Sequence, residues 1–100
     1  MNELVDKLRR NLERWRAYYL VARASGQGKL ALREIERLGR QLAAAIETIE
    51  TAGVPRAARE GAWATAVRAT ARARALLLPR TDQVARALVP ESLPDTLPPA

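Results

Sequence analysis

Apolar side chains recur every three or four residues along the first part of the chain. The stripe consists of Leu4, Leu8, Leu12, Trp15 and Tyr19. Because this spacing places side chains on one face of an α-helix, we predict a helix from Glu3 to about Ala24, with Asn2 as its N-cap. The sequence SGQGK at 25–29 interrupts the pattern, and a glycine there can adopt the left-handed conformation that ends a helix.

Two further segments carry the same helical period. The second stripe consists of Leu32, Ile35, Leu38, Leu42, Ala45, Ile46 and Ile49. It predicts a helix over 30–51. The third stripe is made of small side chains, namely Ala58, Ala62, Ala66, Ala69 and Ala73. It predicts a helix over 56–78 that Pro79 ends, and we expect a short helix at about 82–88.

The alanine stripe of the third helix bears on self-association. A face made of methyl groups lets another helix approach closely, but it buries little apolar area per residue. In a chain of 100 residues this leaves a modest core, and we therefore expect the chain to form a homo-oligomer.

The last eleven residues, PESLPDTLPPA at 90–100, contain four of the six prolines. The unit Pro-acid-Ser/Thr-Leu-Pro occurs twice there, and this composition is typical of an extended, mobile segment that does not pack. We therefore predict one all-α domain at 1–89, built from three long helices, and a flexible Pro-rich C-terminal tail. A solvated end is the favoured interpretation of the tail. The alternative is a short linear motif that presents Leu93 and Leu97 to a groove.

The composition narrows the classes of function. The chain has no cysteine and no histidine, which removes disulfides, thiolate zinc sites and the commonest general base. Its two serines therefore have no histidine to activate them, and we predict a protein that is not an enzyme and holds no cofactor or metal. No apolar run is long enough to cross a bilayer, and the first residues do not resemble a secretory signal. We expect a cytoplasmic protein.

The net charge of +6 is concentrated in one segment, since residues 56–80 hold six arginines and one acid. In the first two helices most charges have an opposite partner three or four residues away, such as Glu34 with Arg37 and Glu36 with Arg40. On the third helix Arg68 and Arg72 have no such partner, so we expect the arginines of this helix to bind phosphate or an acidic surface. The candidates are Arg56, Arg59, Arg68, Arg72 and Arg74. The alternative is an ordinary solvated face.

A second set of candidates lies on the first helix and beside the alanine stripe. Arg10 and Arg14 share one side of the first helix with Tyr18, an arrangement that can hold phosphates and stack a base. Trp63 lies among the arginines of the third helix. Core packing is the favoured interpretation of Tyr18. The glycine pair in SGQGK lacks the spacing of a P-loop, and we interpret it as a turn between helices.

The stretch VPRAAREGAWATA at 54–66 is similar to the opening of the last helix in small helical phage proteins that sequester cyclic-nucleotide signals. In those proteins a proline is followed by Ser-Arg-Glu. Pro55, Arg59 and Glu60 match that pattern here, while Ala58 replaces the serine. The resemblance covers about a quarter of the chain, and it implies an oligomer that binds a cyclic nucleotide.

Three functions are therefore open. The leading hypothesis is a nucleic-acid-binding protein that contacts phosphates through its basic third helix, with a strong salt dependence. The second is an oligomeric binder of a small anionic ligand such as a cyclic nucleotide, with Tyr18 or Trp63 stacking on the base. The third is a helical module that assembles with, or inhibits, an acidic protein partner.

Overall fold

The structure is a computed structural model, and it describes residues 2–98. Within that range the chain forms four helices, α1 (Asn2–Ala24), α2 (Lys29–Glu50), α3 (Arg56–Leu77) and α4 (Gln83–Ala87), and no strand. The predicted all-α fold is confirmed. The second and third helices begin and end within one residue of the predicted positions.

The first helix is slightly longer than predicted, because it already includes Asn2. The capping side chain that we predicted for this residue lies outside what the structure describes. Helix α1 ends in a Schellman motif, in which Gln27 N–H donates to the Ala22 carbonyl at 3.1 Å and Gly26 N–H to the Arg23 carbonyl at 3.2 Å. Gly26 has a φ of 76°, so the predicted left-handed glycine ends the helix.

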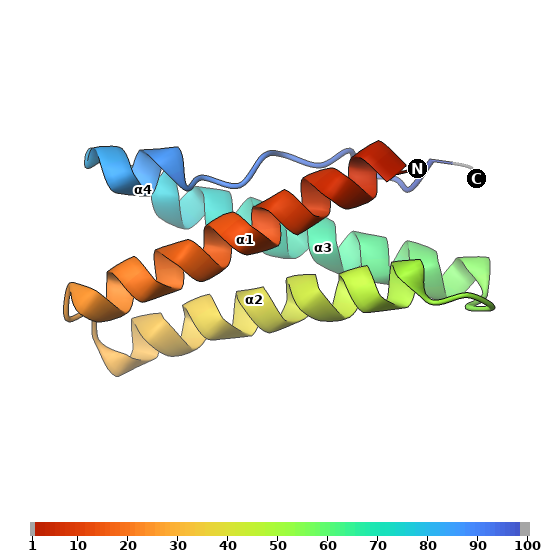
Figure 1. The fold of residues 1–100 in the computed structure, drawn as a ribbon, viewed down its shortest axis with the longest axis horizontal. Coiled ribbons are helices and arrows are strands. Elements are labelled where there is room, and N and C mark those ends of the chain that lie inside the picture. The colour runs from red at the N-terminus through yellow and green to blue at the C-terminus, as the bar shows by residue number, and fades with distance from the viewer. Residues whose placement is uncertain (1, 99–100) are drawn as a thin grey trace.

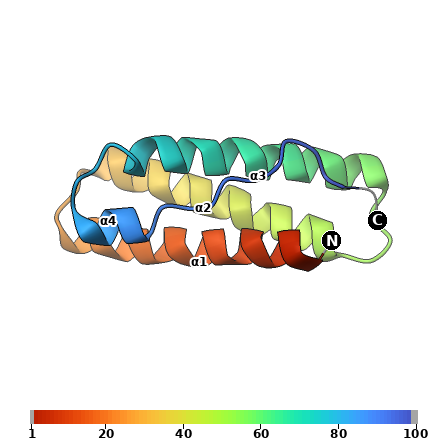
Figure 2. The ribbon, with the colours of Figure 1, turned by 90° about the horizontal axis from the view of Figure 1, so that it is seen from above.

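The three long helices form a flat, elongated bundle of 42 × 22 × 16 Å. Helix α2 runs antiparallel to α1 and to α3 and packs against both, whereas α1 and α3 make few direct contacts with each other (Figure 1). Seen from above, the C-terminal segment runs along the space between α1 and α3, over α2 (Figure 2). Residues 90–98 therefore lie between the two outer helices, and we call the place that they occupy the channel.

The apolar stripes read from the sequence form the core. The side chains of Leu8, Trp15, Leu38, Leu42, Trp63 and Leu77 are fully buried. The indole of Trp15 donates to the Ile35 carbonyl at 2.8 Å, which satisfies its one polar atom at the α1–α2 contact.

The alanine stripe is largely used within the chain itself. Ala66, Ala69 and Ala73 are buried, and the contact between α2 and α3 is the most extensive in the bundle. The small side chains thus allow α2 to approach closely, as expected of a methyl face. Since α2 covers these residues, they no longer support self-association, which stays a prediction.

The expectation that the C-terminal segment does not pack is wrong for residues 90–98. The segment is extended, as its prolines predict, but Pro90 and Leu97 are buried and Leu93 packs against the core. The physical reason is the gap between α1 and α3, which apolar side chains of the segment fill. Residues 99 and 100 lie outside the described part of the chain. We call residues 89–98 the strap.

Candidate functional site: the channel between α1 and α3

Many of the predicted anion-binding residues converge on the channel that contains the strap. Arg10 and Arg14 reach it from α1, and Arg56, Trp63 and Arg74 reach it from α3. The sequence did not show this convergence, because α1 and α3 are separated by the whole length of α2. The structure therefore brings these candidates together, but it also places a part of the chain among them.

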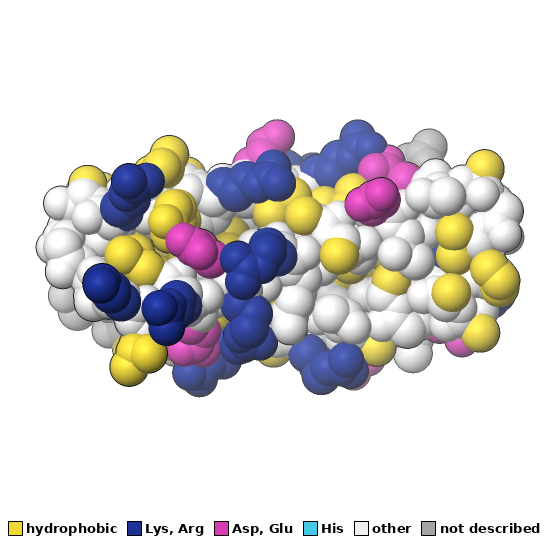
Figure 3. Space-filling model, turned by 90° about the horizontal axis from the view of Figure 1, so that it is seen from below, with side chains coloured by type: hydrophobic (Ala, Val, Ile, Leu, Met, Phe, Trp, Pro, Cys, Tyr) yellow, Lys and Arg dark blue, Asp and Glu magenta, His cyan; other side chains and the backbone are white. Residues whose placement is uncertain are grey.

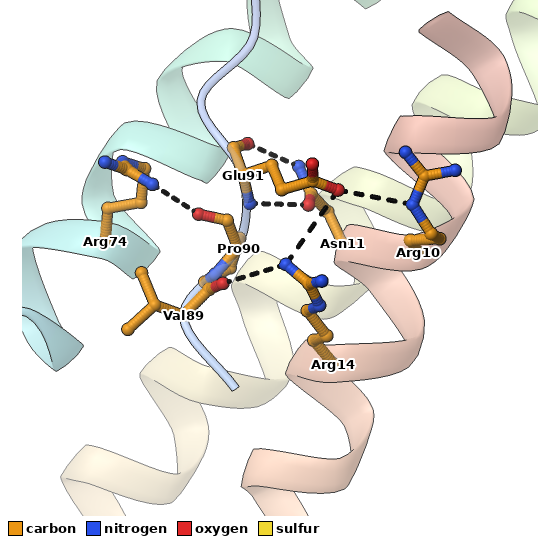
Figure 4. A network of polar contacts seen from close by, with 7 residues as sticks. All are labelled: Arg10, Asn11, Arg14, Arg74, Val89, Pro90 and Glu91. Atoms are coloured by element: carbon orange, nitrogen blue, oxygen red, sulfur yellow. Dashed lines mark hydrogen bonds and ion pairs between the residues drawn. The ribbon is translucent and has the colours of Figure 1, made fainter. Parts of the chain in front are cut away.

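Asn11 holds the strap at one residue through two hydrogen bonds. Its amide nitrogen donates to the Glu91 carbonyl at 2.8 Å, and its amide oxygen accepts from Glu91 N–H at 2.7 Å. Asn11 is completely buried, so both polar atoms of its amide are used in place of water. Figure 4 shows this pair of bonds between α1 and the strap.

Arginines on both walls of the channel donate to the same part of the strap (Figure 4). Arg14 Nη1 donates to the Val89 carbonyl at 3.2 Å, and Arg74 Nη1 donates to the Pro90 carbonyl at 2.6 Å. The Glu91 carboxylate forms an ion pair with Arg10 at 3.2 Å and a longer one with Arg14 at 3.9 Å. One acid of the strap thus compensates part of the positive charge on α1.

The strap is held by α3 further along its length. The Trp63 indole donates to the Pro94 carbonyl at 2.8 Å, and Arg56 Nη2 donates to the Leu97 carbonyl at 2.9 Å. Arg56 also pairs with Glu60 at 2.9 Å, one turn further along α3. Trp63 is only 1% exposed, so its ring is part of the core and is not available to stack on a base.

The other two candidates, Tyr18 and Arg59, differ in their contacts. Tyr18 is buried, its ring lies 5.4 Å from that of Trp15, and its hydroxyl accepts hydrogen bonds from Gln27 and Arg80. These contacts support the favoured interpretation of Tyr18 as a core residue. Arg59 is half-buried, and its Nε is buried without a hydrogen-bond partner within residues 2–98.

Arg68 and Arg72 lie on the opposite side of α3, facing away from the strap. Arg72 Nε donates to the Glu34 carboxylate of α2 at 2.7 Å, so this arginine is not the unpartnered cation that we expected. The hydrogen bond lowers the pKa of Glu34 and raises that of Arg72. Arg68 is exposed, and its nearest recorded contact is the Thr65 hydroxyl at 3.4 Å.

The pairing of Glu34 with α3 changes the charge of α2. We expected Glu34 to pair with Arg37 within the helix, but the structure pairs it with Arg72 and leaves Arg37 without a carboxylate partner in the part of the chain it describes. The pair of Glu36 with Arg40 does form, at 3.6 Å. Arg37 is thereby added to Lys29 and Arg33, which are exposed on the same side of α2 and form no ion pair there.

These cations form a surface that the sequence analysis missed. Lys29, Arg33 and Arg37 are four residues apart, so they lie along the side of α2 opposite its apolar stripe. We define the outer basic face as Lys29, Arg33 and Arg37. Arg16 and Arg23 of α1 and Arg68 of α3 are exposed on the two helices that flank α2. Figure 3 shows this side of the molecule, and most of its Lys and Arg side chains lie on the half where α2 begins. The four-residue spacing of these cations is visible in the sequence. It was missed because Glu34 and Glu36 lie between Arg33 and Arg37 and were expected to neutralise cations of the same helix.

An open groove of about 420 Å³ between α1 and α2 borders this face. Its lining is mostly apolar, with Trp15, Leu20 and Ala43 among the contributors, and Arg16 and Arg40 also line it. The Tyr19 hydroxyl donates to the Glu36 carboxylate in the groove at 2.6 Å, and this bond raises the pKa of the phenol.

Comparisons with known proteins add no assignment. The chain matches no protein-family model, no curated protein and no solved structure. The described residues contain no group of three acidic side chains that could hold a metal ion. None of the helices in residues 2–98 is long and apolar enough to cross a membrane.

Proposed function

We propose that the protein is a non-enzymatic nucleic-acid-binding protein that holds the phosphate backbone with its outer basic face. The observation that carries this proposal is the row of Lys29, Arg33 and Arg37, which are exposed and have no carboxylate within ion-pair distance in the described chain. Like charges at this helical spacing repel one another, and a polyanion would relieve that repulsion.

The dimensions of the face suit a nucleic-acid backbone. At a rise of about 1.5 Å per residue, Lys29 and Arg37 are about 12 Å apart along α2. A DNA duplex presents one negative charge per about 1.7 Å of its axis, so roughly seven charges lie within that length. Arginine donates two parallel hydrogen bonds to a phosphate, and at least half of the hydrogen bonds between proteins and DNA go to phosphate and sugar oxygens.

The proposed partner is still nucleic acid, but the proposed contact surface is the outer basic face in place of the third helix. In the sequence-based hypothesis the third helix carried the phosphate contacts, with Arg56, Arg72 and Arg74 among them. In the structure those guanidiniums donate to Glu60, Glu34 and the strap. Of the predicted set, Arg68 is exposed on a helix that flanks the outer basic face.

The test is a binding measurement by fluorescence anisotropy, with labelled single- and double-stranded DNA at two salt concentrations. For about five phosphate contacts we expect affinity for duplex to fall roughly 10²–10³-fold between 50 and 200 mM salt. A double variant, Arg33→Glu with Arg37→Glu, should lose about 10²-fold at the lower salt, because it removes two contacts and adds two repulsions.

The matched control is Lys7→Glu with Arg86→Glu, which changes the net charge equally at two other cations that form no ion pair within residues 2–98. These residues lie on the channel side of α1 and on α4, away from the outer basic face. Absence of binding at low salt would exclude the proposed function. Equal losses in the two double variants would exclude the outer basic face as the binding surface.

The groove between α1 and α2 supports a second candidate, a small anionic ligand such as a cyclic nucleotide. Its apolar lining and Tyr19 ring suit a base, while Arg16 and Arg40 suit a phosphate. A thermal-shift screen with mono-, di- and cyclic nucleotides tests this, since a ligand that binds only the folded protein raises its Tm. The variant Tyr19→Ala should abolish the shift, and the absence of a shift with every nucleotide would exclude this function.

A further inference from the structure

The channel between α1 and α3 recognises the strap mainly through its backbone. Five strap carbonyls accept hydrogen bonds from side chains of the two helices. They belong to Val89, Pro90, Glu91, Pro94 and Leu97. Hydrogen bonds to the main chain of one extended segment are the contacts by which grooves bind extended peptides.

The chemistry of the channel favours a peptide over a nucleic-acid strand. Asn11 needs both a donor and an acceptor from one residue of its ligand, and Glu91 supplies them as N–H and C=O. The sugar–phosphate backbone of DNA has acceptors but no donor, so it would leave the Asn11 amide oxygen unpaired. Pro90 and Leu97 are buried in the channel, which adds two apolar sites that peptide side chains fill.

The segment that links the bundle to the strap has little packing, although Arg80 within it donates to the Tyr18 hydroxyl at 3.2 Å. Every residue from 78 to 84 is exposed, and Leu78 and Val84 keep 56% and 52% of their surface in solvent. In the short helix α4 that follows, the buried residue is Ala85. The chain therefore joins a specifically bound strap to a stable bundle through a segment with little packing, which includes Pro79.

We propose that the channel is a peptide-binding site and that a second copy of the chain supplies its ligand, through reciprocal exchange of straps. An exchanged pair makes the same channel contacts as the closed chain. The difference in free energy between the two forms therefore depends on the linking segment. In an exchanged pair the two linking segments pass from one bundle to the other side by side. Leu78 and Val84 can then cover each other, which favours the pair over the closed chain. This inference does not depend on the proposed nucleic-acid binding.

The absence of cysteine from the chain allows a direct test. One full-length variant carries Arg10→Cys in the channel, and a second carries Glu91→Cys in the strap, at positions whose side chains pair at 3.2 Å. The two are mixed at a protein concentration on the order of 1 mM, where a strap from another chain competes with the tethered one. A short bismaleimide then links neighbouring thiols, and a denaturing gel separates one chain from two.

Exchange predicts a covalent pair that contains one chain of each variant. The control variant Arg16→Cys, on the opposite side of α1, should give no such pair with Glu91→Cys. A single chain that carries both Arg10→Cys and Glu91→Cys reports whether the thiols can be linked at all. If that chain is linked within itself while the mixture gives no pair, the proposal is wrong.

Light scattering of the unmodified chain gives an independent measurement. The fraction of two-chain species should rise with protein concentration, and Leu78→Ser should lower that fraction severalfold. Leu20→Ser, which changes an equally exposed leucine on α1, should leave it unchanged. A single-chain species at every concentration would overturn the proposal. A Leu97→Asn variant gives a second way to overturn it. If this variant binds single-stranded DNA more tightly and forms no two-chain species, the channel is a nucleic-acid site that the strap covers.

Discussion

The channel and the outer basic face are both rich in arginine, but their arginines are in opposite states. In the channel, Arg14 and Arg74 each donate to a fixed carbonyl of the strap. On the outer basic face, Arg33 and Arg37 are exposed and form no ion pair within the described chain. The comparison teaches that the density of arginine along a sequence does not identify a binding surface. The acceptors that tertiary structure brings near decide which guanidiniums remain available.

The position of an acid in the fold decides which arginine it pairs with, and Glu34 is an example. Glu34 has Arg37 three residues further along its helix, the spacing at which pairs form on one helix. It pairs instead with Arg72 across the α2–α3 contact. One carboxylate thereby removes a cation from the predicted site on α3 and adds one to the outer basic face.

The largest expected effect comes from opening the channel at Trp63. The variant Trp63→Ala should lower the free energy of unfolding by about 3–5 kcal/mol, because it leaves a cavity beneath the strap. Urea denaturation measures this loss. Trp63→Phe keeps most of the volume and removes the bond to Pro94, so it should cost about 1 kcal/mol. If Trp63→Ala lowers the free energy of unfolding by less than about 1 kcal/mol, Trp63 is not a core residue that packs beneath the strap.

Asn11→Ala should have the next largest effect. It leaves the N–H and C=O of Glu91 without partners in a part-buried site, which we expect to cost about 1–3 kcal/mol. The control is Ser92→Ala, at the next, exposed strap position, which should change stability by less than about 0.5 kcal/mol. Equal unfolding midpoints for the two variants would show that Asn11 does not hold the strap.

Glu34→Gln should leave Arg72 without its ion-pair partner and so free to contact a phosphate. It breaks the ion pair with Arg72, whose partners are both partly exposed, so the stability loss should stay below about 1 kcal/mol. If the proposed nucleic-acid binding is correct, the log–log salt dependence should steepen by about 1 unit. Glu47→Gln removes one charge from the same helix without releasing an arginine, and its salt dependence should stay unchanged.

The smallest effect concerns pH. Hydrogen bonds from Arg72, Arg9 and Arg80 lower the pKa values of Glu34, Glu50 and Asp82 respectively below their ordinary values of 4.5, 4.5 and 3.8. A lowered pKa in the folded state contributes stability above the unfolded value, and this contribution is lost as the pH falls through the folded value. We therefore expect stability to decline below about pH 4.5.

The decline should be shallower in Glu34→Gln than in the unmodified chain, since one of the three titrating pairs is missing. Urea midpoints measured from pH 7 to pH 3 test this. Parallel curves for the two proteins would show that the pair of Glu34 with Arg72 does not form in solution.

Local patterns in the sequence were sufficient for the helices and their ends. A period of three to four residues, a glycine at 26 and a proline at 79 act within a few residues of themselves, and the structure follows them. The packing of the strap was not accessible in this way. Its composition is typical of an unpacked end, and only the gap between α1 and α3 gives Pro90 and Leu97 a place to be buried.

The amino-acid order therefore determined which segments are helical and which face of each helix is apolar, because hydrogen bonds and side-chain spacing within a helix are local. The assignment of partners was decided by the tertiary structure alone. It placed Glu34 beside Arg72 and laid the strap across Arg10, Arg14 and Arg74. Hydrogen bonds and ion pairs act over a few ångströms of space, so separation along the chain does not predict them.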